Sequence, residues 1–235
     1  MTALEPKQGI AATDWDAARQ EMVARQIQAR GIHSERVLAA MRTVPRHLFV
    51  SQDMAGDAYA DVPLPIGEGQ TISQPYIVAA IAEALSLYGG EHVLEIGAGC
   101  GYLAAVLSLL ARRVTAIESQ PALAARAREN IERLRYRNVE IVEGDGSAGW
   151  PAEAPYEAIA VSAAAPRVPT PLLEQVTENG RLVIPVGGRD SQELVRIVRT
   201  ESGFKSEPIC NCRFVPLLGH YGWNGSPKTQ ENQKI

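Results

Sequence analysis

The sequence predicts an α/β fold: a doubly wound, mostly parallel β-sheet with helices on both faces and an N-terminal cap of helices and loops. From residue 92 onward, short β-prone apolar runs alternate with stretches of helical periodicity. One strand is followed directly by a tight turn with glycines at 97, 99 and 101, and then by an apolar helix. Before this point, two helical patterns lead into a proline-rich stretch. Strands joined by helices pair in parallel, because a parallel connection needs a crossover.

Composition and charge narrow the classes of protein to which the chain can belong. Its 235 residues are 46% hydrophobic, enough for a sizeable core, and its net charge of −4 gives no support for a nucleic-acid or anionic-membrane partner. The apolar run at 103–111 is too short to span a bilayer, and residues 1–13 lack the apolar core of a signal peptide. The three cysteines show no zinc or disulfide spacing. We expect a cytoplasmic monomer with reduced thiols and no metal, membrane or nucleic-acid partner.

The first elements are predicted by their capping residues. Asp14 is placed to cap a helix over 15–30, which Gly31 ends, and Ser34 is placed to cap a second helix over 35–42. These two helices open the N-terminal cap.

Residues 44–75 are expected to be irregular, because they contain four prolines and three glycines. A connection of this length is usually functional or disordered, and its many apolar residues argue against disorder. We interpret it as a loop that wraps over a functional site. An irregular structural cap is the alternative.

The later elements follow from apolar periodicity and turn residues. Expected helices occupy 75–87, 103–112, 121–134 and a short stretch near 172–176. Expected strands occupy 92–96, 114–118, 139–142, 158–161, 181–186, 193–199 and part of 209–217. The charged residues of the helix over 121–134 are expected to form a solvated face.

In such sheets ligands bind beyond the carboxyl ends of the strands, where the glycine turn, Glu118, Asp145 and the turn at 162–166 are expected to meet. Glycines let a ligand approach the backbone closely, and the helix start directs free N–H groups towards it. Glu118 lies roughly twenty residues after Gly97, where a carboxylate can accept two hydrogen bonds from a ribose diol. Asp145 lies between two glycines, where it can reach an adenine edge.

Two ligands fit this arrangement in outline, a nicotinamide dinucleotide and S-adenosylmethionine. A dinucleotide fingerprint places its third glycine where this chain has Tyr102. Glu95, within the strand end, would face a pyrophosphate unfavourably but suits the ammonium group of S-adenosylmethionine. The glycine spacing and Glu95 therefore favour S-adenosylmethionine.

Two stretches carry a family resemblance. Residues 93–102, VLEIGAGCGY, resemble the first motif of class I methyltransferases, which have a Rossmann-like sheet. Residues 59–76, YADVPLPIGEGQTISQPY, resemble nearly residue for residue the signature of protein-L-isoaspartate O-methyltransferases. Shorter blocks of similarity follow at 138–139, 144–146, 154–159, 163–166, 182–187 and 213–217. The resemblance covers roughly 15–223 and is specific because the motifs occur together.

The resemblance implies a protein repair methyltransferase. It would transfer a methyl group from S-adenosylmethionine to the free α-carboxylate of L-isoaspartyl residues in damaged proteins, leaving S-adenosylhomocysteine. The methyl ester would then collapse through a succinimide, which allows partial return to aspartate. Ser73 occupies the family's active-site serine position. The expected cofactor-binding residues are Ile72, Glu95, Gly97, Gly99, Gly101, Glu118, Ser119, Asp145 and Gly146, and the expected substrate-binding residues are Ile66, Gln70 and Thr71.

The expected reaction agrees with the residues present. A carboxylate nucleophile is already ionised near neutral pH, so alignment and exclusion of water are required rather than a general base. Ser73 can donate a hydrogen bond that orients this carboxylate. Ser73 can also cap the helix that starts near Pro75, and both roles can hold together.

Three rival functions are a family member that acts on another peptide carboxylate, a non-catalytic S-adenosylmethionine-binding protein, and a nicotinamide dehydrogenase. The glycine spacing disfavours the dehydrogenase, and the intact loop at 70–73 argues against a non-catalytic protein. The expected organisation is a flexible N-terminus over 1–13, one methyltransferase domain over 14–223 and a flexible tail over 224–235. Within the domain, 14–88 form the helical and substrate-loop cap and 89–223 the cofactor-binding sheet.

Overall fold

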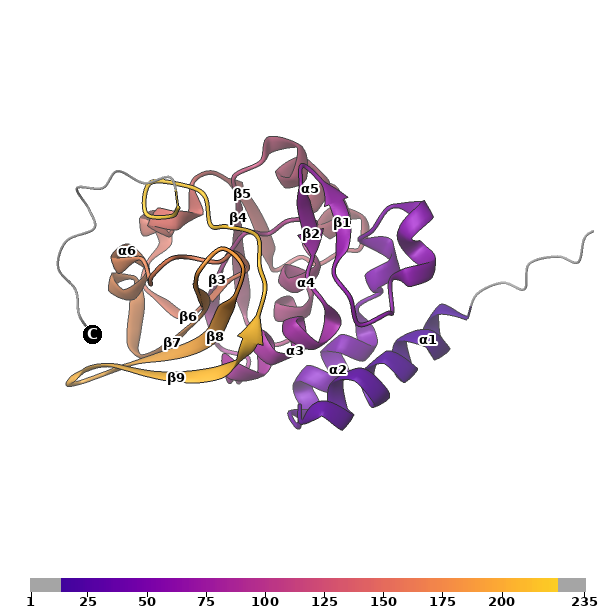
Figure 1. Cartoon of the computed structure of the whole chain (residues 1–235), viewed down its shortest axis with the longest axis horizontal. Coiled ribbons are helices and arrows are strands. Elements are labelled where there is room, and N and C mark those ends of the chain that lie inside the picture. Colours follow the sequence, from indigo (N-terminus) through magenta and orange to yellow (C-terminus); the bar gives the residue numbers. More distant parts are fainter. Residues whose placement is uncertain (1–13, 224–235) are drawn as a thin grey trace, which may run out of the picture.

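The computed structural model describes residues 14–223, which form one sheet with helices on both faces and a helical cap at one end (Figure 1). The expected flexible segments 1–13 and 224–235 lie outside the described residues. Within 14–223, no helix is both long and apolar enough to cross a membrane.

The described residues form a seven-stranded sheet in the order β5-β4-β3-β6-β7-β8-β9. These strands are β3 (His92–Ile96), β4 (Arg113–Glu118), β5 (Val139–Glu143), β6 (Tyr156–Val161), β7 (Val176–Gly187), β8 (Gln192–Thr200) and β9 (Gly203–Cys212). The pairs from β5 to β7 are parallel, whereas β7, β8 and β9 pair antiparallel. The expected doubly wound, mostly parallel fold is confirmed.

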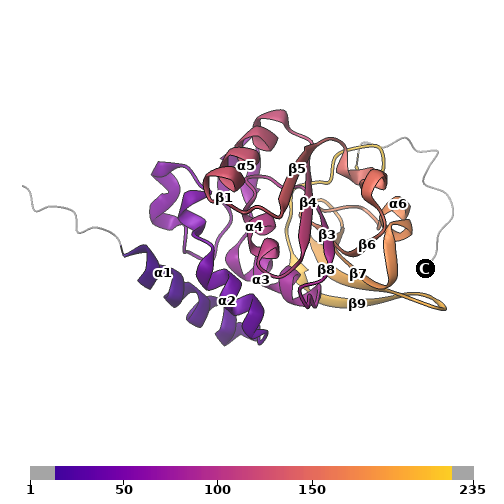
Figure 2. The ribbon, with the colours of Figure 1, turned by 180° about the vertical axis from the view of Figure 1, so that it is seen from behind.

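Helices cover both faces of this sheet (Figures 1 and 2). On one face lie α3 (Pro75–Ala84), α4 (Tyr102–Ser108) and α5 (Pro121–Arg133), and on the other lies α6 (Thr170–Glu174). Alternate side chains of β3 serve the two faces: Val93 joins the core beneath α3 to α5, while Leu94 and Ile96 join the core on the α6 side. The central strand is therefore buried on both sides, as its continuous apolar pattern predicts.

The N-terminal cap contains the two expected helices. The first begins as α1 (Trp15–Met22) and continues through a π turn (Val23–Ile27) and a 3₁₀ turn (Gln28–Arg30), and the second is α2 (Glu35–Thr43). The Asp14 carboxylate accepts from the Ala17 N–H at 2.9 Å, and the Ser34 hydroxyl accepts from the Val37 N–H at 3.4 Å. Both predicted caps are confirmed.

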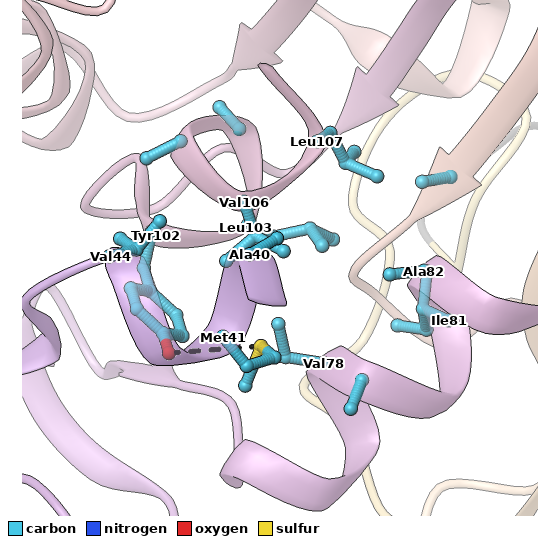
Figure 3. Close-up of a cluster of buried hydrophobic side chains, with 14 of the residues drawn as sticks. Ala40, Met41, Val44, Val78, Ile81, Ala82, Tyr102, Leu103, Val106 and Leu107 are labelled. Atoms are coloured by element: carbon cyan, nitrogen blue, oxygen red, sulfur yellow. Dashed lines mark hydrogen bonds between the residues drawn. The ribbon is translucent and has the colours of Figure 1, made fainter. Parts of the chain in front are cut away.

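Helix α2 joins the cap to the core by packing against α3 and α4 (Figure 3). Met41 lies beside Val78 of α3 and Tyr102 of α4, and the Tyr102 hydroxyl lies 4.0 Å from the Met41 sulfur. Because α4 directly follows the glycine turn, this contact connects the cap to that turn.

The segment 44–75 is more regular than the sequence predicts. It contains short 3₁₀ helices (Arg46–Leu48 and Gln52–Asp57) and a hairpin formed by β1 (Leu64–Gly67) and β2 (Gln70–Ile72). The hairpin turn has positive φ at Glu68 and Gly69, the geometry that matches the twist of the strands. Such turns favour glycine, asparagine and aspartate, and Glu68 is none of these. The local sequence therefore gives no strong indication of the hairpin.

Several boundaries also differ from expectation. Helix α3 ends at Ala84 rather than 87, because the Arg181 guanidinium of β7 binds the Leu85 and Ser86 carbonyls at 2.7 and 2.6 Å. Strand β7 begins at Val176, earlier than the expected 181. Strand β9 covers Gly203–Cys212 rather than part of 209–217.

The expected solvated face of α5 is confirmed except at one arginine, since Arg128, Glu129, Glu132 and Arg133 are exposed. Arg126 is half-buried and donates to the Ile66 carbonyl at 3.0 Å and the Phe49 carbonyl at 3.3 Å. The exposed Arg133 donates to the Leu48 carbonyl at 2.8 Å. Through these contacts α5 holds the segment 48–66 against the sheet domain.

The contact between the cap and the core is tested by Met41→Ala. Met41 is 0% exposed, so truncation leaves a cavity and is expected to lower the free energy of unfolding by about 2–5 kcal/mol. Urea denaturation measures this loss. Tyr88, which is 80% exposed, provides the control, and Tyr88→Ala should change stability by less than about 0.5 kcal/mol. Equal, small effects of both substitutions would contradict the packing described.

Candidate functional site

A pocket of about 830 Å³, its open mouth included, lies where the carboxyl ends of β3, β4 and β6 meet the β1–β2 hairpin. The glycine turn after β3 forms its floor, residues 70–73 form one wall, and residues 215–218 form the opposite wall. The expected site residues that line it are Gln70, Thr71, Ile72, Ser73, Glu95, Gly97, Gly99, Glu118, Ser119 and Gly146.

The glycine turn is held open towards the pocket by backbone hydrogen bonds. The N–H groups of Gly97 and Ala98 donate to the Ile117 carbonyl at 2.9 and 3.0 Å. Gly99 has a φ of +56°, and a Cβ there would lie 3.2 Å from Cδ1 of Ile66, which packs over the turn from the hairpin. A side chain at this position would require Cδ1 of Ile66 to move by a few tenths of an ångström, and the positive φ itself favours glycine.

Glu118 ends β4 with its carboxylate fixed by the backbone. It accepts from the Gly99 N–H at 2.8 Å and from the Gln120 N–H at 2.9 Å, and it is 6% exposed. A carboxylate has capacity for about four hydrogen bonds, so Glu118 retains acceptor sites that face the pocket. This arrangement suits a ligand with neighbouring hydroxyl groups.

Glu95 is the buried charge of the site. It is 1% exposed, lines the pocket, and its Oε2 has no hydrogen-bond partner among the described residues. Desolvation, and then the nearby Glu118 carboxylate, raise the pKa of Glu95 well above its ordinary range. An orphaned buried carboxylate is costly, and a ligand ammonium group would satisfy it. The donor set therefore fits the amino-acid and ribose parts of S-adenosylmethionine.

Ser73 lies half-buried in the hairpin wall and does not cap the following helix. The cap residue of α3 is Gln74, which makes no capping hydrogen bond. The Tyr76 N–H of the first turn instead donates to the Asp61 carboxylate at 3.1 Å. The capping interpretation of Ser73 is wrong, and its hydroxyl is left to face the pocket.

Asp145 does not line this pocket, although the adjacent Gly146 does. Its carboxylate accepts from the Ser147 N–H at 2.9 Å and the His220 N–H at 2.8 Å. Burial opposes its ionisation, but these hydrogen bonds outweigh burial and lower the pKa of Asp145. The carboxylate thus anchors the C-terminal segment. Asp145 also lines an adjoining hollow that shares Ser119, Gln120 and Leu218 with the pocket, and its expected contact with an adenine edge stays a prediction.

Two further expected residues lie just outside the pocket lining. Gly101 starts α4 with a φ of +87°, and a Cβ there would meet Ala127 and Ile131 of α5. Ile66 contacts the glycine turn rather than the cavity. Both therefore support the walls of the site from behind.

The C-terminal wall was missed as part of the site. Residues 215–218 reach the pocket because the Leu217 N–H donates to the Ala164 carbonyl at 2.7 Å and the Ala164 N–H donates to the Val215 carbonyl at 2.8 Å. Val78, Leu103 and Gln120 also line the pocket without a predicted role, whereas Ser162 and Ala163 belong to the turn at 162–166 that was expected at this edge. The only sequence signal was the family-like block at 213–217.

Neither a reactive thiol nor a metal centre is found in the described part of the chain. Cys100 of the glycine turn is buried, and desolvation raises its pKa to about 11, so its thiol stays protonated. Within residues 14–223, no group of three histidine, cysteine, aspartate or glutamate side chains is placed to hold a metal ion.

Comparison with known proteins decides the family. The family model described as protein-L-isoaspartate(D-aspartate) O-methyltransferase matches residues 17–222. The chain belongs to this family. A protein-L-isoaspartate O-methyltransferase of Methanoculleus marisnigri is 54% identical over 88% of this chain and 94% of its own. One of Syntrophobacter fumaroxidans is 51% identical over 90% of this chain and 99% of its own.

Solved structures of the family have the same fold. A protein-L-isoaspartate O-methyltransferase has a TM-score of 0.78 at 29% identity, and the match covers 86% of this chain and 67% of that one. A family protein of Plasmodium falciparum, solved with S-adenosyl-L-homocysteine, has a TM-score of 0.73 at 24% identity, covering 85% of this chain and 98% of that one.

The unpaired Glu95 carboxylate leads to a prediction for ligand binding. Burial holds Glu95 protonated without ligand, whereas an ammonium group favours its charged form. Binding of S-adenosylhomocysteine should therefore release a proton below the raised pKa of Glu95 and should tighten as pH rises towards that pKa. Titration calorimetry in two buffers of different ionisation enthalpy measures both effects.

The variant Glu95→Gln should bind about 10- to 150-fold more weakly and lose this pH dependence, since a hydrogen bond to a charged group contributes about 1.5–3 kcal/mol. The exposed Glu129 of α5 provides the control Glu129→Gln. Because its folded pKa is raised, Glu95 stabilises the ligand-free fold below its unfolded pKa, and this contribution is lost as pH rises. Binding of equal strength at every pH, without proton exchange, would rule out contact between Glu95 and the ammonium group.

Proposed function

We propose that this protein is an S-adenosylmethionine-dependent methyltransferase that acts on the free α-carboxylate of L-isoaspartyl residues in damaged proteins. The observation that carries the proposal is that one pocket has buried carboxylates on one side and a serine hydroxyl on the other. The orphaned Glu95 carboxylate and the fixed Glu118 carboxylate lie on the nucleoside side, and Ser73 lies on the facing hairpin. Membership of the family supports this function.

On the cofactor side, the residues have separate tasks. Glu95 would pair with the ammonium group, and Glu118 with Ser119 beside it would hold the ribose hydroxyls. Gly97 and Gly99 give the ligand close access to the backbone, and Gly146 and Ile72 contact it from the flanks. S-adenosylmethionine supplies a methyl group activated by the positive sulfur.

On the substrate side, the chain orients a nucleophile that needs no activation. Among the described residues that line the pocket there is no histidine or lysine. An isoaspartyl carboxylate is ionised at neutral pH, so one of its oxygens can form the bond to the methyl carbon while the carbon–sulfur electron pair remains on sulfur. Ser73 would donate a hydrogen bond to that carboxylate, and Gln70 and Thr71 would hold the peptide backbone. The hairpin and the segment 215–218 exclude water.

The product accounts for repair. Methoxide leaves from a methyl ester far more readily than oxide leaves from a carboxylate. The neighbouring peptide nitrogen therefore attacks the ester carbonyl, and methoxide departs with the nitrogen's proton as methanol, which leaves a succinimide. Hydrolysis of this ring returns part of the material to aspartate. This later chemistry requires no residue of the protein.

We further propose a single domain that works as a cytoplasmic monomer without nucleic acid. One continuous core supports the single domain, because it includes Met22 and Met41 of the cap together with Val93 of the sheet. The net charge of −4 is unfavourable for binding a phosphate backbone.

The activity is tested with an isoaspartyl peptide and its aspartyl counterpart of identical sequence. Labelled methyl groups from S-adenosylmethionine should appear as base-labile ester on the isoaspartyl peptide alone. Labelling of both peptides would contradict the specificity, and ester on another peptide carboxylate only would identify a different substrate. Binding of S-adenosylhomocysteine without any transfer would indicate a non-catalytic protein.

The role of Ser73 is tested by Ser73→Ala. Because misplacement of reacting groups can cost on the order of 100-fold in rate, kcat for the isoaspartyl peptide should fall about 10- to 100-fold. Affinity for S-adenosylhomocysteine and the melting temperature should stay near those of the wild type. Ser206→Ala, on the exposed part of β9, is the matched control. A purely structural Ser73 would instead lower the melting temperature and leave kcat unchanged.

A further inference from the structure

We propose that Asp61 is a positioning residue that holds Ser73 in place, an inference that rests on the proposed role of Ser73. Ser73 makes no side-chain hydrogen bond within the described part of the chain, so its placement depends on its neighbours in sequence. Ile72 precedes it at the end of β2, and Gln74 follows it at the start of α3. What holds these two neighbours determines where the Ser73 hydroxyl points.

Asp61 holds the neighbour on the C-terminal side. Its Oδ2 accepts from Nε2 of Gln74 at 2.6 Å, and its Oδ1 accepts from the Tyr76 N–H at 3.1 Å. Asp61 therefore caps α3 from a separate part of the chain. A carboxylate at this end of a ten-residue helix also interacts favourably with the helix dipole.

The hairpin holds the neighbour on the other side. Ile72 pairs with Leu64 in the β1–β2 ladder, and Leu64 follows Asp61 by three positions. Two contacts therefore join the ends of the chain segment from Asp61 to Gln74. One is the strand pairing of Leu64 with Ile72, and the other is the hydrogen bond from Gln74 to the Asp61 carboxylate. Ser73 lies between these two contacts and cannot shift without breaking one of them.

Asp61 is itself anchored from beneath by Arg46, which is 0% exposed. The Arg46 side chain donates from Nε to the Ala58 carbonyl at 2.7 Å and from Nη2 to the Val62 carbonyl at 3.4 Å, on either side of Asp61. Its guanidinium also lies over the ring of Tyr102, 5.0 Å from the centroid. The support under Asp61 therefore extends to the first residue of α4, next to the glycine turn.

Arg30 completes the surroundings of Asp61 without replacing this role. Its guanidinium pairs with Oδ2 of Asp61 and lies 3.7 Å from the centroid of the Tyr76 ring. The arginine side chain is 45% exposed and that of Asp61 is 20% exposed, so solvent weakens the ion pair. The hydrogen bonds to Gln74 and Tyr76 are the contacts that connect Asp61 to Ser73.

The first test compares Asp61→Ala with Asp61→Asn in the isoaspartyl assay. Alanine removes both acceptors, and kcat should fall about tenfold while KM for S-adenosylmethionine stays within twofold. Asparagine retains an acceptor for the Tyr76 N–H and can pair with a rotated Gln74 amide, so it should restore most of kcat. A loss as large with asparagine as with alanine would overturn the proposal.

Gln74→Leu, which removes only the donor, should give part of the alanine effect and remains measurable if Asp61→Ala fails to fold.

The second test asks whether Asp61 acts through Ser73. In the Ser73→Ala background, Asp61→Ala should lower kcat by less than twofold, because there is no hydroxyl left to position. Glu83 gives a matched control, since it accepts from the N–H groups of His33 and Ser34 at 2.7 Å each and so supports the start of another helix. Glu83→Ala should lower the melting temperature without lowering kcat. Fully additive effects of Asp61→Ala and Ser73→Ala would overturn the proposal.

A third measurement does not depend on activity. Hydrogen exchange of the backbone amides at 72–78 should accelerate in Asp61→Ala and stay unchanged in Glu83→Ala. Wild-type protein without isoaspartyl activity would refute the proposed function alone, and exchange would still decide whether Asp61 holds this segment. Unchanged exchange at 72–78 in Asp61→Ala would overturn the inference even in an active enzyme.

Discussion

The close contact between the hairpin and the glycine turn is the constraint on which the rest of the structure depends. Cδ1 of Ile66 packs closely over Gly99, which has no Cβ in the way, and Arg126 of α5 donates to the Ile66 carbonyl. The hairpin is thereby fixed over the carboxyl ends of the parallel strands. The contact between Ile66 and Gly99 thereby positions both sides of the pocket. One side fits a cofactor, and the other carries Ser73.

Two buried ionisable groups have different roles: one holds the scaffold together, and the other is placed to bind a ligand. Arg46 is fully buried, and its Nε and Nη2 donate to backbone carbonyls of the segment 58–62, while its Nη1 has no partner among the described residues. Arg46 therefore supports the scaffold through two of its three nitrogens. Glu95 is equally buried, lines the pocket and has an oxygen without a partner, next to a second carboxylate. Burial favours the protonated form of Glu95, and a cationic ligand group in the pocket would favour its charged form.

The chemistry proposed for the site explains its modest set of polar groups. A reaction between an ionised nucleophile and an activated methyl group requires that the reacting groups be aligned and that water be excluded, rather than that a proton be transferred. The structure supplies these by enclosing the pocket between residues 70–73 and 215–218 and by holding the first wall at several points. Asp61, Arg126 and Arg46 contribute to that wall without touching the cavity.

The sequence by itself determined the strand, turn and helix around Gly97–Gly101, the two capped N-terminal helices and the parallel sheet, because these depend on local periodicity and local hydrogen bonds. It also placed most of the pocket-lining residues. Only the tertiary structure decided that Asp145 binds the His220 N–H, that Asp61 rather than Ser73 caps α3, and that Arg126 clamps the hairpin. Each of these contacts joins residues far apart in the chain, and local pattern contains no information about which distant partner a polar side chain will meet.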